Sequence, residues 1–483
     1  MNRVSAVRSL FLTLALMLLA GCGGGSASSV TAPLSADNLN LIFVVSPDLA
    51  YHAPGDVHLD TANLSTQGLQ RSLLMAPFLQ QQVLGMNNVS RIYALQPMSH
   101  LQTANSYPDM AALVYIQQFA MLNQITLTSG VNSAPAYSYP INVSYNNLGP
   151  IPADVAAPWS KAPCPACQGL VFNDTRLDNA ALVGAIVKAN SPGFHVFSAP
   201  WETISELLAN INKLQGYNLT LPANFVSPNL IYAITITPAG SASLVTYNSN
   251  LSPPATYPVL SPPLVVGQSC TATPFTITAS GPKVAINANQ TLYLVRHAEA
   301  HPTSYWEDGN YIATGQWRAL ALANALPGKI SPTQVYSIDP AQVTPAGSAS
   351  SSWGNSSWSY VRPSLTVAPY AIANNLPYKL VASLELLDPL SPSKTVDFFF
   401  KDSNFAGTTV LLAWEHDHIP PIIDVLLASY GTKSQNTAPK WQGEDYDSIW
   451  KATTDGSGNL TVDNLKCEGI YTAPPLPLTA PQF

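Results

Sequence analysis

A short apolar run that ends in an arginine and a histidine constrains the fold of this chain most. Residues 292–295 have the pattern of a buried strand, and Arg296 and His297 follow directly. In an open α/β sheet, ligands bind at the loops that leave the carboxyl ends of the strands. A guanidinium there offers a fork of donors to a phosphoryl group, and a neutral imidazole beside it is a nucleophile. The run therefore predicts an α/β sheet with a reactive edge.

A second apolar strand ends in the same way. Residues 408–414 are apolar or small, and the run Glu415-His416-Asp417-His418 follows at once. Arg362 opens a further segment with helical character. Because the carboxyl ends of parallel strands share one sheet edge, both histidines are expected in one site. The helices predicted around these strands are 315–326, 364–375 and 422–430, with a short strand at 335–337.

These residues resemble the signature of the histidine phosphatase superfamily, which includes the phosphoglycerate mutases. The resemblance covers residues 286–470, and the run Arg296-His297-Ala298-Glu299 is similar to the family's Arg-His-Gly signature with alanine in place of glycine. It implies a three-layer αβα domain at 286–475. It also implies that His297 becomes phosphorylated, while Arg296, Arg362 and His416 bind the phosphoryl group.

The chemistry of these side chains fits phosphate ester hydrolysis. A phosphate monoester is doubly negative, and Arg296, Arg362 and His416 would form a convergent set of donors. His297 would attack through one neutral ring nitrogen while a backbone carbonyl holds the other. This route needs no metal and no cofactor, and its substrate is a small phosphorylated molecule.

The proton donor has four candidates in the sequence. Glu385 is the first choice, because it follows the segment opened by Arg362, where one branch of the resembled family keeps its acid. Asp417 directly follows the second histidine, as in the acid phosphatase branch. Glu299 and Glu307 lie nearer the first histidine in sequence.

The N-terminal half repeats this layout in the same order. Residues 39–250 are expected to be a degenerate histidine-phosphatase-like copy, which makes the chain two tandem αβα domains. In this reading Ser46 and Pro47 stand at the positions of Arg296 and His297. The other paired positions are Gly68 with Gly315, Arg71 with Arg318, Tyr93 with Tyr336, Asp109 with Arg362, and Trp201 with His416. An aspartate in place of the second arginine would repel phosphate.

The ends of the chain predict its location. Residues 1–22 combine an early positive charge, an apolar run too short to span a bilayer and a terminal Cys22, the pattern of a bacterial lipoprotein signal. We expect lipidation of Cys22, a flexible tether at 23–38, and anchoring in the cell envelope, in the outer membrane facing the periplasm. A Pro-rich linker is expected at 251–285 and an irregular tail at 476–483.

Composition agrees with an extracytoplasmic protein. The 483 residues carry a net charge of −7 and no basic run, which argues against nucleic-acid binding. After Cys22, four cysteines remain, an even number for an oxidising compartment. We expect a local disulfide between Cys164 and Cys167, and a bridge between Cys270 and Cys467 that ties the ends of the C-terminal domain.

Two alternative functions follow from other interpretations of the same residues. The cluster His416-Asp417-His418 has metal-ligand residue types at close spacing, which suits a metal-dependent hydrolase. A surface lipoprotein that only binds a phosphorylated ligand is the non-catalytic alternative. The oligomeric state is left open.

Overall fold

The fold was examined in a computed structural model of the chain. The structure describes residues 31–483 except 104, 124, 130–131, 138–140, 146–178, 262–268, 301–307, 344–358, 382–383, 387, 433–436 and 471–475. The predicted lipoprotein signal, Cys22, Cys164 and Cys167 lie outside these residues. In the described part, no helix has the length and apolar character to cross a bilayer.

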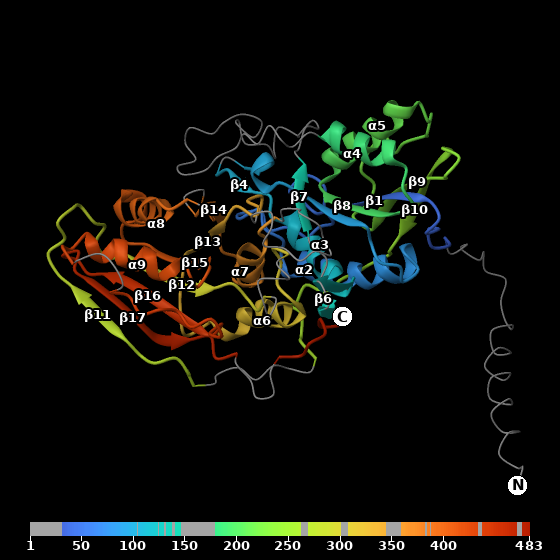
Figure 1. The fold of residues 1–483 in the computed structure, drawn as a ribbon. Helices are drawn as coiled ribbons and strands as arrows, with labels where there is room; N and C mark the ends of the chain where they lie inside the picture. The colour runs from blue at the N-terminus through green and yellow to red at the C-terminus, as the bar shows by residue number, and fades with distance from the viewer. Residues whose placement is uncertain are drawn as a thin grey trace, which may run out of the picture. The chain divides into compact units, whose positions relative to one another are not determined.

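The C-terminal half is built on a mixed sheet of seven strands (Figure 1). Their order is β11-β17-β16-β12-β15-β13-β14, and the central β12 runs parallel to β15 and antiparallel to β16. Both β12 and β15 are buried over nearly their whole length, as their apolar sequences require. The strands are β11 (Thr276–Ala279), β12 (Thr291–Arg296), β13 (Gln334–Ile338), β14 (Tyr378–Val381), β15 (Thr409–Trp414), β16 (Ser448–Thr454) and β17 (Leu460–Cys467).

Helices join these strands close to the predicted places. The expected helix at 315–326 is α6 (Ala313–Ala325), and the segment opened by Arg362 is α7 (Arg362–Ala373). The last expected helix is α9 (Ile419–Ala428), which begins three residues early because its two prolines occupy the first turn. A short helix that the sequence did not suggest, α8 (Ser391–Val396), follows β14.

The N-terminal half contains a second mixed sheet, of six strands, in the order β10-β9-β1-β8-β2-β7. Its strands are β1 (Leu39–Val45), β2 (Arg91–Leu95), β7 (Ile141–Tyr145), β8 (Gly193–Ala199), β9 (Leu230–Ile236) and β10 (Ala242–Asn248). Its helices are α2 (Thr66–Phe78), α3 (Ala111–Leu122), α4 (Asn179–Ala189) and α5 (Trp201–Gln215). Two small strand pairs accompany it, β3 (Leu101–Gln102) with β4 (Tyr107–Pro108), and β5 (Ile125–Ser129) with β6 (Asn132–Tyr137).

The two sheets have the same plan. In each, a central strand lies parallel to one neighbour and antiparallel to the other, and β10-β9-β1-β8-β2-β7 corresponds in order and direction to β17-β16-β12-β15-β13-β14. The first helix of each half also holds a buried arginine against a carboxylate. Arg71 Nε lies 2.9 Å from Asp56, and Arg318 Nε lies 2.8 Å from Glu299. These shared features are what an internal duplication would leave.

A glycine one turn before each arginine has the same role in both halves. A Cβ atom on Gly68 would lie 2.1 Å from the Asp56 carbonyl oxygen, and one on Gly315 would lie 2.8 Å from that of Glu299. Both distances are too short for a side chain, so glycine lets each helix approach the loop that carries the carboxylate.

The register of the strands corrects two of the paired positions. Ser46 N–H donates to Ala199 O at 2.8 Å, as His297 N–H donates to Trp414 O at 2.9 Å. Ser46 therefore corresponds to His297, and the preceding valine corresponds to Arg296. Pro47 therefore corresponds to neither Arg296 nor His297. The paired positions expected from the sequence were one residue out, because residues 41–45 and 292–295 are apolar or aromatic throughout and contain no polar residue that would fix the register.

Asp109 is also displaced from its predicted partner. Helix α7 begins at Arg362, whereas α3 begins at Ala111, two residues after Asp109. By helix position, an alanine stands where the second arginine would be. The aspartate instead precedes the helix and contacts a histidine described below.

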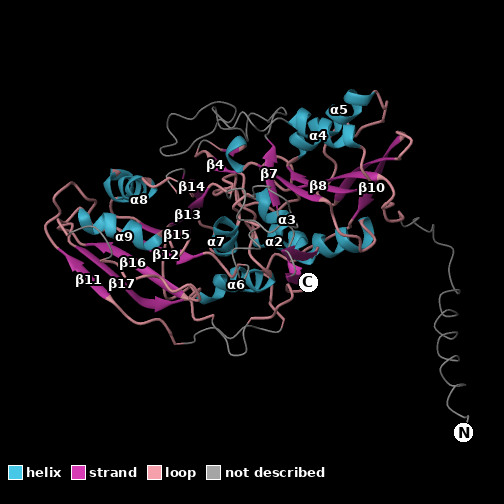
Figure 2. Ribbon diagram, viewed as in Figure 1, coloured by secondary structure: helices cyan, strands magenta, loops and turns pink. Residues whose placement is uncertain are grey.

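The two halves pack against each other through their helices, with α3 against α6 and α7, and α2 against α7 (Figures 1 and 2). Gln117 and Asn310 exchange two side-chain hydrogen bonds, of 3.0 and 3.1 Å. Gln316 donates to Gln118 at 2.9 Å. Buried apolar residues of both halves form one continuous core cluster. Residues 33–483 are accordingly one compact unit.

The predicted linker and tail take part in this packing. Residues 276–279 of the linker form β11, which pairs with β17 and extends the sheet. The disulfide between Cys270 and Cys467 is present, with a Cα–Cα distance of 5.5 Å. The tail is bound to helix α6, where Trp317 donates its indole N–H to the carbonyl oxygen of Thr479 at 2.6 Å. The linker prediction was wrong at β11 because its Pro-rich surroundings hid a four-residue strand.

Candidate active site

His297 is the first residue after β12, and two hydrogen bonds fix its loop. Its ring Nδ1 lies 2.7 Å from the Ala298 carbonyl oxygen, so Nδ1 carries the proton of the neutral ring and Nε2 is left as the nucleophilic nitrogen. The Ala298 N–H donates to Thr366 Oγ1 at 2.8 Å, and Thr366 lies in α7. The loop is thus tied to the helix that begins with Arg362.

Both predicted arginines are buried in this region. Arg296 is 5% exposed and its guanidinium lies 3.8 Å from the centre of the Tyr446 ring, and it donates to the Gly443 carbonyl oxygen at 2.5 Å. Arg362 is 2% exposed and lies 4.9 Å from the centre of the Tyr360 ring. Two desolvated cations beside a histidine make a strongly attractive position for an anion.

The surroundings of His297 keep its ring neutral. Burial, followed by the charges of Arg362 and Arg296, lowers the pKa of His297 well below 6.5. Burial lowers the pKa of Arg362 to about 10, so its guanidinium stays charged at neutral pH. A neutral imidazole between charged donors is the state that attack on a phosphoryl group requires.

His416 follows β15 by two residues, at the same sheet edge as His297. Burial, followed by the charge of Arg296, lowers the pKa of His416. Its Nε2 lies 3.5 Å from an Asp417 carboxylate oxygen. His418 is directed differently, because its Nδ1 pairs with Glu415 at 3.1 Å and its ring lies 4.9 Å from that of Trp414. The structure therefore distinguishes the two histidines of the run.

Glu415 is a site residue to which the sequence assigned no role in phosphate chemistry. Burial alone would raise its pKa, but the hydrogen bond with His418 and the nearby His297 and Arg362 lower it to about 2. Tyr360 also contacts this carboxylate. The sequence feature that could have identified Glu415 is its position directly after the apolar strand β15.

The four carboxylates considered as proton donors differ in their surroundings. Asp417 is exposed and adjoins His416. The Glu385 side chain is 45% exposed and pairs with Lys394 at 3.5 Å, and among the described residues its contacts do not include the histidines or arginines of the site. Glu299 is bound by Arg318 and is unsuited to proton transfer. Glu307 lies outside the described residues.

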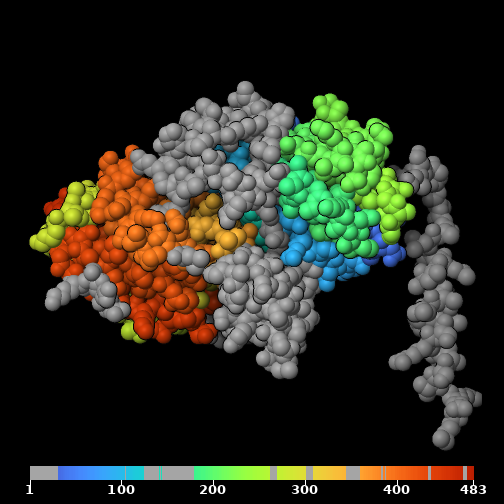
Figure 3. Space-filling view, turned by 45° about the horizontal axis from the view of Figure 1, so that its top comes forward, coloured from blue at the N-terminus to red at the C-terminus, as the bar shows by residue number. Residues whose placement is uncertain are grey.

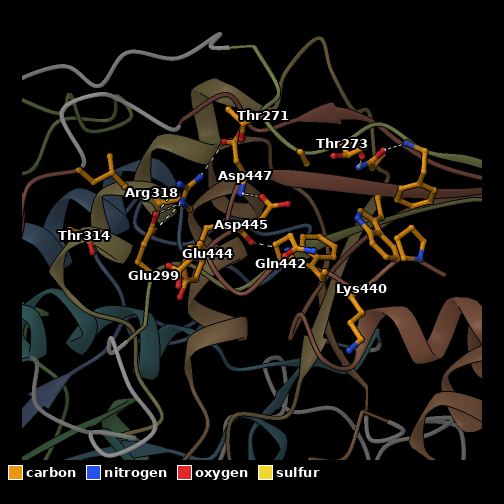
Figure 4. Close-up of a pocket in the computed structure, with 18 of the residues that line it drawn as sticks. Thr271, Thr273, Glu299, Thr314, Arg318, Lys440, Gln442, Glu444, Asp445 and Asp447 are labelled. Carbon is orange, nitrogen blue, oxygen red and sulfur yellow. Dashed lines mark hydrogen bonds and ion pairs between the residues drawn. The ribbon is translucent and has the colours of Figure 1, made fainter. Parts of the chain in front are cut away.

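A cavity of about 700 Å³ adjoins the site (Figure 4). Tyr446 links the two, because it lines the cavity and its ring centre lies 6.1 Å from that of His297. Figure 4 shows Arg318 pointing to Glu299 and Asp447 on one wall. The aromatic part of the lining consists of Phe275, Trp441, Tyr446 and Trp450.

The metal alternative is not supported by the geometry of residues 415–418. In the part of the chain that the structure describes, their ligand atoms do not form a group of three within 4.8 Å of one another. The Nδ1 atom of His418 pairs with Glu415 and not with a group shared with His416. Among the described residues, the group that meets this distance lies in the N-terminal half and consists of Asp48, His100 and Glu202.

Comparisons with known proteins give structural likenesses only. No family model and no curated protein matches the chain. A mycobacterial glucosyl-3-phosphoglycerate phosphatase in complex with inorganic phosphate aligns over 34% of this chain and 89% of its own, with 13% identity and a TM-score of 0.24. Bacillus stearothermophilus YhfR aligns over 35% of this chain and 93% of its own, with 15% identity and a TM-score of 0.24.

A putative phosphohistidine phosphatase SixA from Nakamurella multipartitia is also similar. It aligns over 38% of this chain and 94% of its own, with 15% identity and a TM-score of 0.22. At such identities and TM-scores these likenesses do not bear on the activity. The chain itself has mixed α/β sheets with helices, and its chemistry must be inferred from its own residues.

Proposed function

We propose that this protein is a metal-independent phosphatase that hydrolyses phosphate monoesters through a phosphohistidine on His297. The observation that carries the proposal is the state of His297. Its ring is buried, is held by a carbonyl at Nδ1, and has a lowered pKa beside Arg296 and Arg362. A histidine that served only the core would gain nothing from two buried cations.

The reaction is proposed in two steps. His297 Nε2 attacks phosphorus, the bond from phosphorus to the ester oxygen breaks, and a donor protonates the leaving alcohol. Water then attacks the phosphohistidine and releases inorganic phosphate. Arg296, Arg362 and His416 stabilise the charge on the phosphoryl oxygens in both steps. We assign the donor role to Asp417 in preference to Glu385, because Asp417 adjoins His416 whereas Glu385 pairs with Lys394.

The cavity beside Tyr446 is proposed to receive the organic part of the ester. Tyr446 borders both the cavity and the reactive histidine, and the lining is partly aromatic. A panel of monoesters that compares glycerol phosphate with aryl phosphates is therefore a suitable first assay.

The N-terminal half is proposed to be a degenerate copy that braces the active half. The shared strand order supports a duplication, and Ser46 in place of a histidine removes the nucleophile. The core cluster that spans both halves supports the bracing role. From the sequence alone, we propose that residues 1–22 direct lipidation of Cys22 and anchoring in the bacterial cell envelope.

Turnover of the folded protein should survive removal of metal ions. Because the phosphoryl group is bound by Arg296, Arg362 and His416, incubation with EDTA should change kcat by less than about twofold. The measurement is release of inorganic phosphate, with circular dichroism on the same sample to show that the protein is folded. Loss of turnover from a folded protein, restored by Zn²⁺, would refute this mechanism in favour of a metal-dependent hydrolase.

The activity should be retained at mildly acidic pH. His297 loses its attacking lone pair only as the pH falls through its lowered pKa, so protonation of the nucleophile should not limit the rate at pH 6.5. A profile of kcat/KM against pH tests this expectation. An acidic limb with a midpoint at or above pH 6.5 would contradict the environment described for His297.

A further inference from the structure

A second cluster of chemically reactive side chains lies in the N-terminal half, at the carboxyl edge of its sheet. Asp48 follows β1, His100 follows β2, and Glu202 is the second residue of α5, directly after β8. The three strands are parallel, so their carboxyl ends bring these residues together. All three side chains are buried, at 0%, 0% and 2% exposure.

The distances within this cluster suit one metal ion. His100 Nε2 lies 3.0 Å from Glu202 Oε1 and 3.9 Å from Asp48 Oδ2. Two ligands of a tetrahedral zinc ion, each about 2.0–2.1 Å from it, lie about 3.4 Å apart. The observed separations lie on either side of that value. One ligand atom from each residue falls within 4.8 Å of the other two.

The outer contacts orient the three ligands. His100 Nδ1 lies 2.7 Å from Asp109 Oδ2, which holds the ring so that Nε2 faces Asp48 and Glu202. Metal-binding histidines in proteins commonly hold a carboxylate in this way. The Ala50 and Tyr51 N–H groups donate to Asp48 Oδ1 and so turn its Oδ2 to the cluster.

The atoms that face the centre of the cluster are buried and approach only one another. Within the described residues, Asp48 Oδ2 and Glu202 Oε2 make no hydrogen bond, and His100 Nε2 has only its 3.0 Å contact with Glu202 Oε1 and its 3.9 Å contact with Asp48 Oδ2. Such atoms are costly unless a cation or a proton satisfies them.

We propose that Asp48, His100 and Glu202 are three ligands of a buried binding site for one divalent transition-metal ion, preferentially Zn²⁺. One imidazole and two carboxylates are ligands that zinc accepts. Figure 3 shows the green atoms of α4 and α5 at the surface of this half, whereas the three ligands are buried. The ion would join the loop after β1, the segment after β2 and the start of α5. This site is independent of the proposed phosphatase activity.

The test is zinc binding by the full-length protein stripped of metal. Zn²⁺ alone is titrated in competition with a fluorescent chelator, and bound metal is counted by mass spectrometry. Wild type should bind one Zn²⁺ and gain thermal stability, since an ion that binds only the folded state stabilises it. His100→Gln should abolish this binding, and Asp109→Asn should weaken it by about 10–100-fold through loss of the outer contact. His58→Gln, in the same half, is the matched control and should bind as wild type.

Substitution of cobalt separates this site from the Cys164 and Cys167 pair. Co²⁺ held by nitrogen and oxygen ligands lacks the charge-transfer absorption that thiolates give, so wild type should show none. The proposal is overturned if wild type binds no zinc, if His100→Gln binds as wild type does, or if bound metal is lost only when both cysteines become serine. Phosphatase turnover of folded His100→Gln should equal that of wild type. A changed turnover of His100→Gln would contradict the independence of this site from the phosphatase activity, whereas the zinc titration tests the binding of the metal itself.

Discussion

Replacing His297 by alanine should lower kcat by about ten-thousandfold or more, because it removes the atom that bonds to phosphorus. The rings of Tyr360 and Tyr446 lie beside His297, and they cannot take over its role as a nitrogen nucleophile. The measurement is phosphate release at saturating substrate. A variant that keeps a tenth of the wild-type rate would show that His297 is not the nucleophile.

Two further variants make this result specific. His416→Ala should retain a measurable rate, about 10²- to 10³-fold below wild type, because it removes a charge-stabilising donor and leaves the nucleophile. Ser46→Ala changes the residue that corresponds to His297 in the first sheet and should leave the rate unchanged. Equal losses in Ser46→Ala and His297→Ala would indicate that both halves contribute to catalysis.

Replacing Arg318 by methionine should have the largest effect on stability. Arg318 is 1% exposed and holds three carboxylates, with Nη1 2.6 Å from Glu468 and 3.4 Å from Asp447, and Nε 2.8 Å from Glu299. Burial, with the charge of Asp447, raises the pKa of Glu468 to about 8 in spite of Arg318. The single positive charge of Arg318 therefore does not fully balance the three carboxylates. Without the cation, we expect a loss of about 3–5 kcal/mol in the free energy of unfolding.

Denaturant unfolding measures this loss, and Lys394→Met is the matched control. Lys394 pairs with Glu385 and Asp388 at the surface, where water solvates both partners, so its removal should have little effect. An equal effect of the two variants, or a stable Arg318→Met, would mean that the buried network does not stabilise the fold.

The strands that position the site could be predicted from the sequence. The runs that became β12 and β15 are apolar throughout, and a buried strand must end where charged residues begin. That rule alone placed Arg296, His297 and His416 at one sheet edge. Helices α6, α7 and α9 were found from helix-forming residues and prolines, within three residues of their ends.

Side-chain partners and the packing of the halves could not be predicted in the same way. Whether Glu385 faces the site or the solvent depends on its pairing with Lys394, which is set by the path of a loop. The strand β11 was missed because four residues in a Pro-rich stretch carry too little pattern. The cluster at His100 depends on residues from three separated segments, and no local spacing reveals it.

The nature of the covalent intermediate tests the central claim most directly. Rapid quenching of wild-type protein with labelled monoester should trap a phosphoenzyme that is labile in acid and stable in base, as a phosphoramidate is. Peptide mapping should place the label on His297, and His297→Ala should give no adduct. A label that is stable in acid and lies on a serine, or one on an aspartate, would contradict the account.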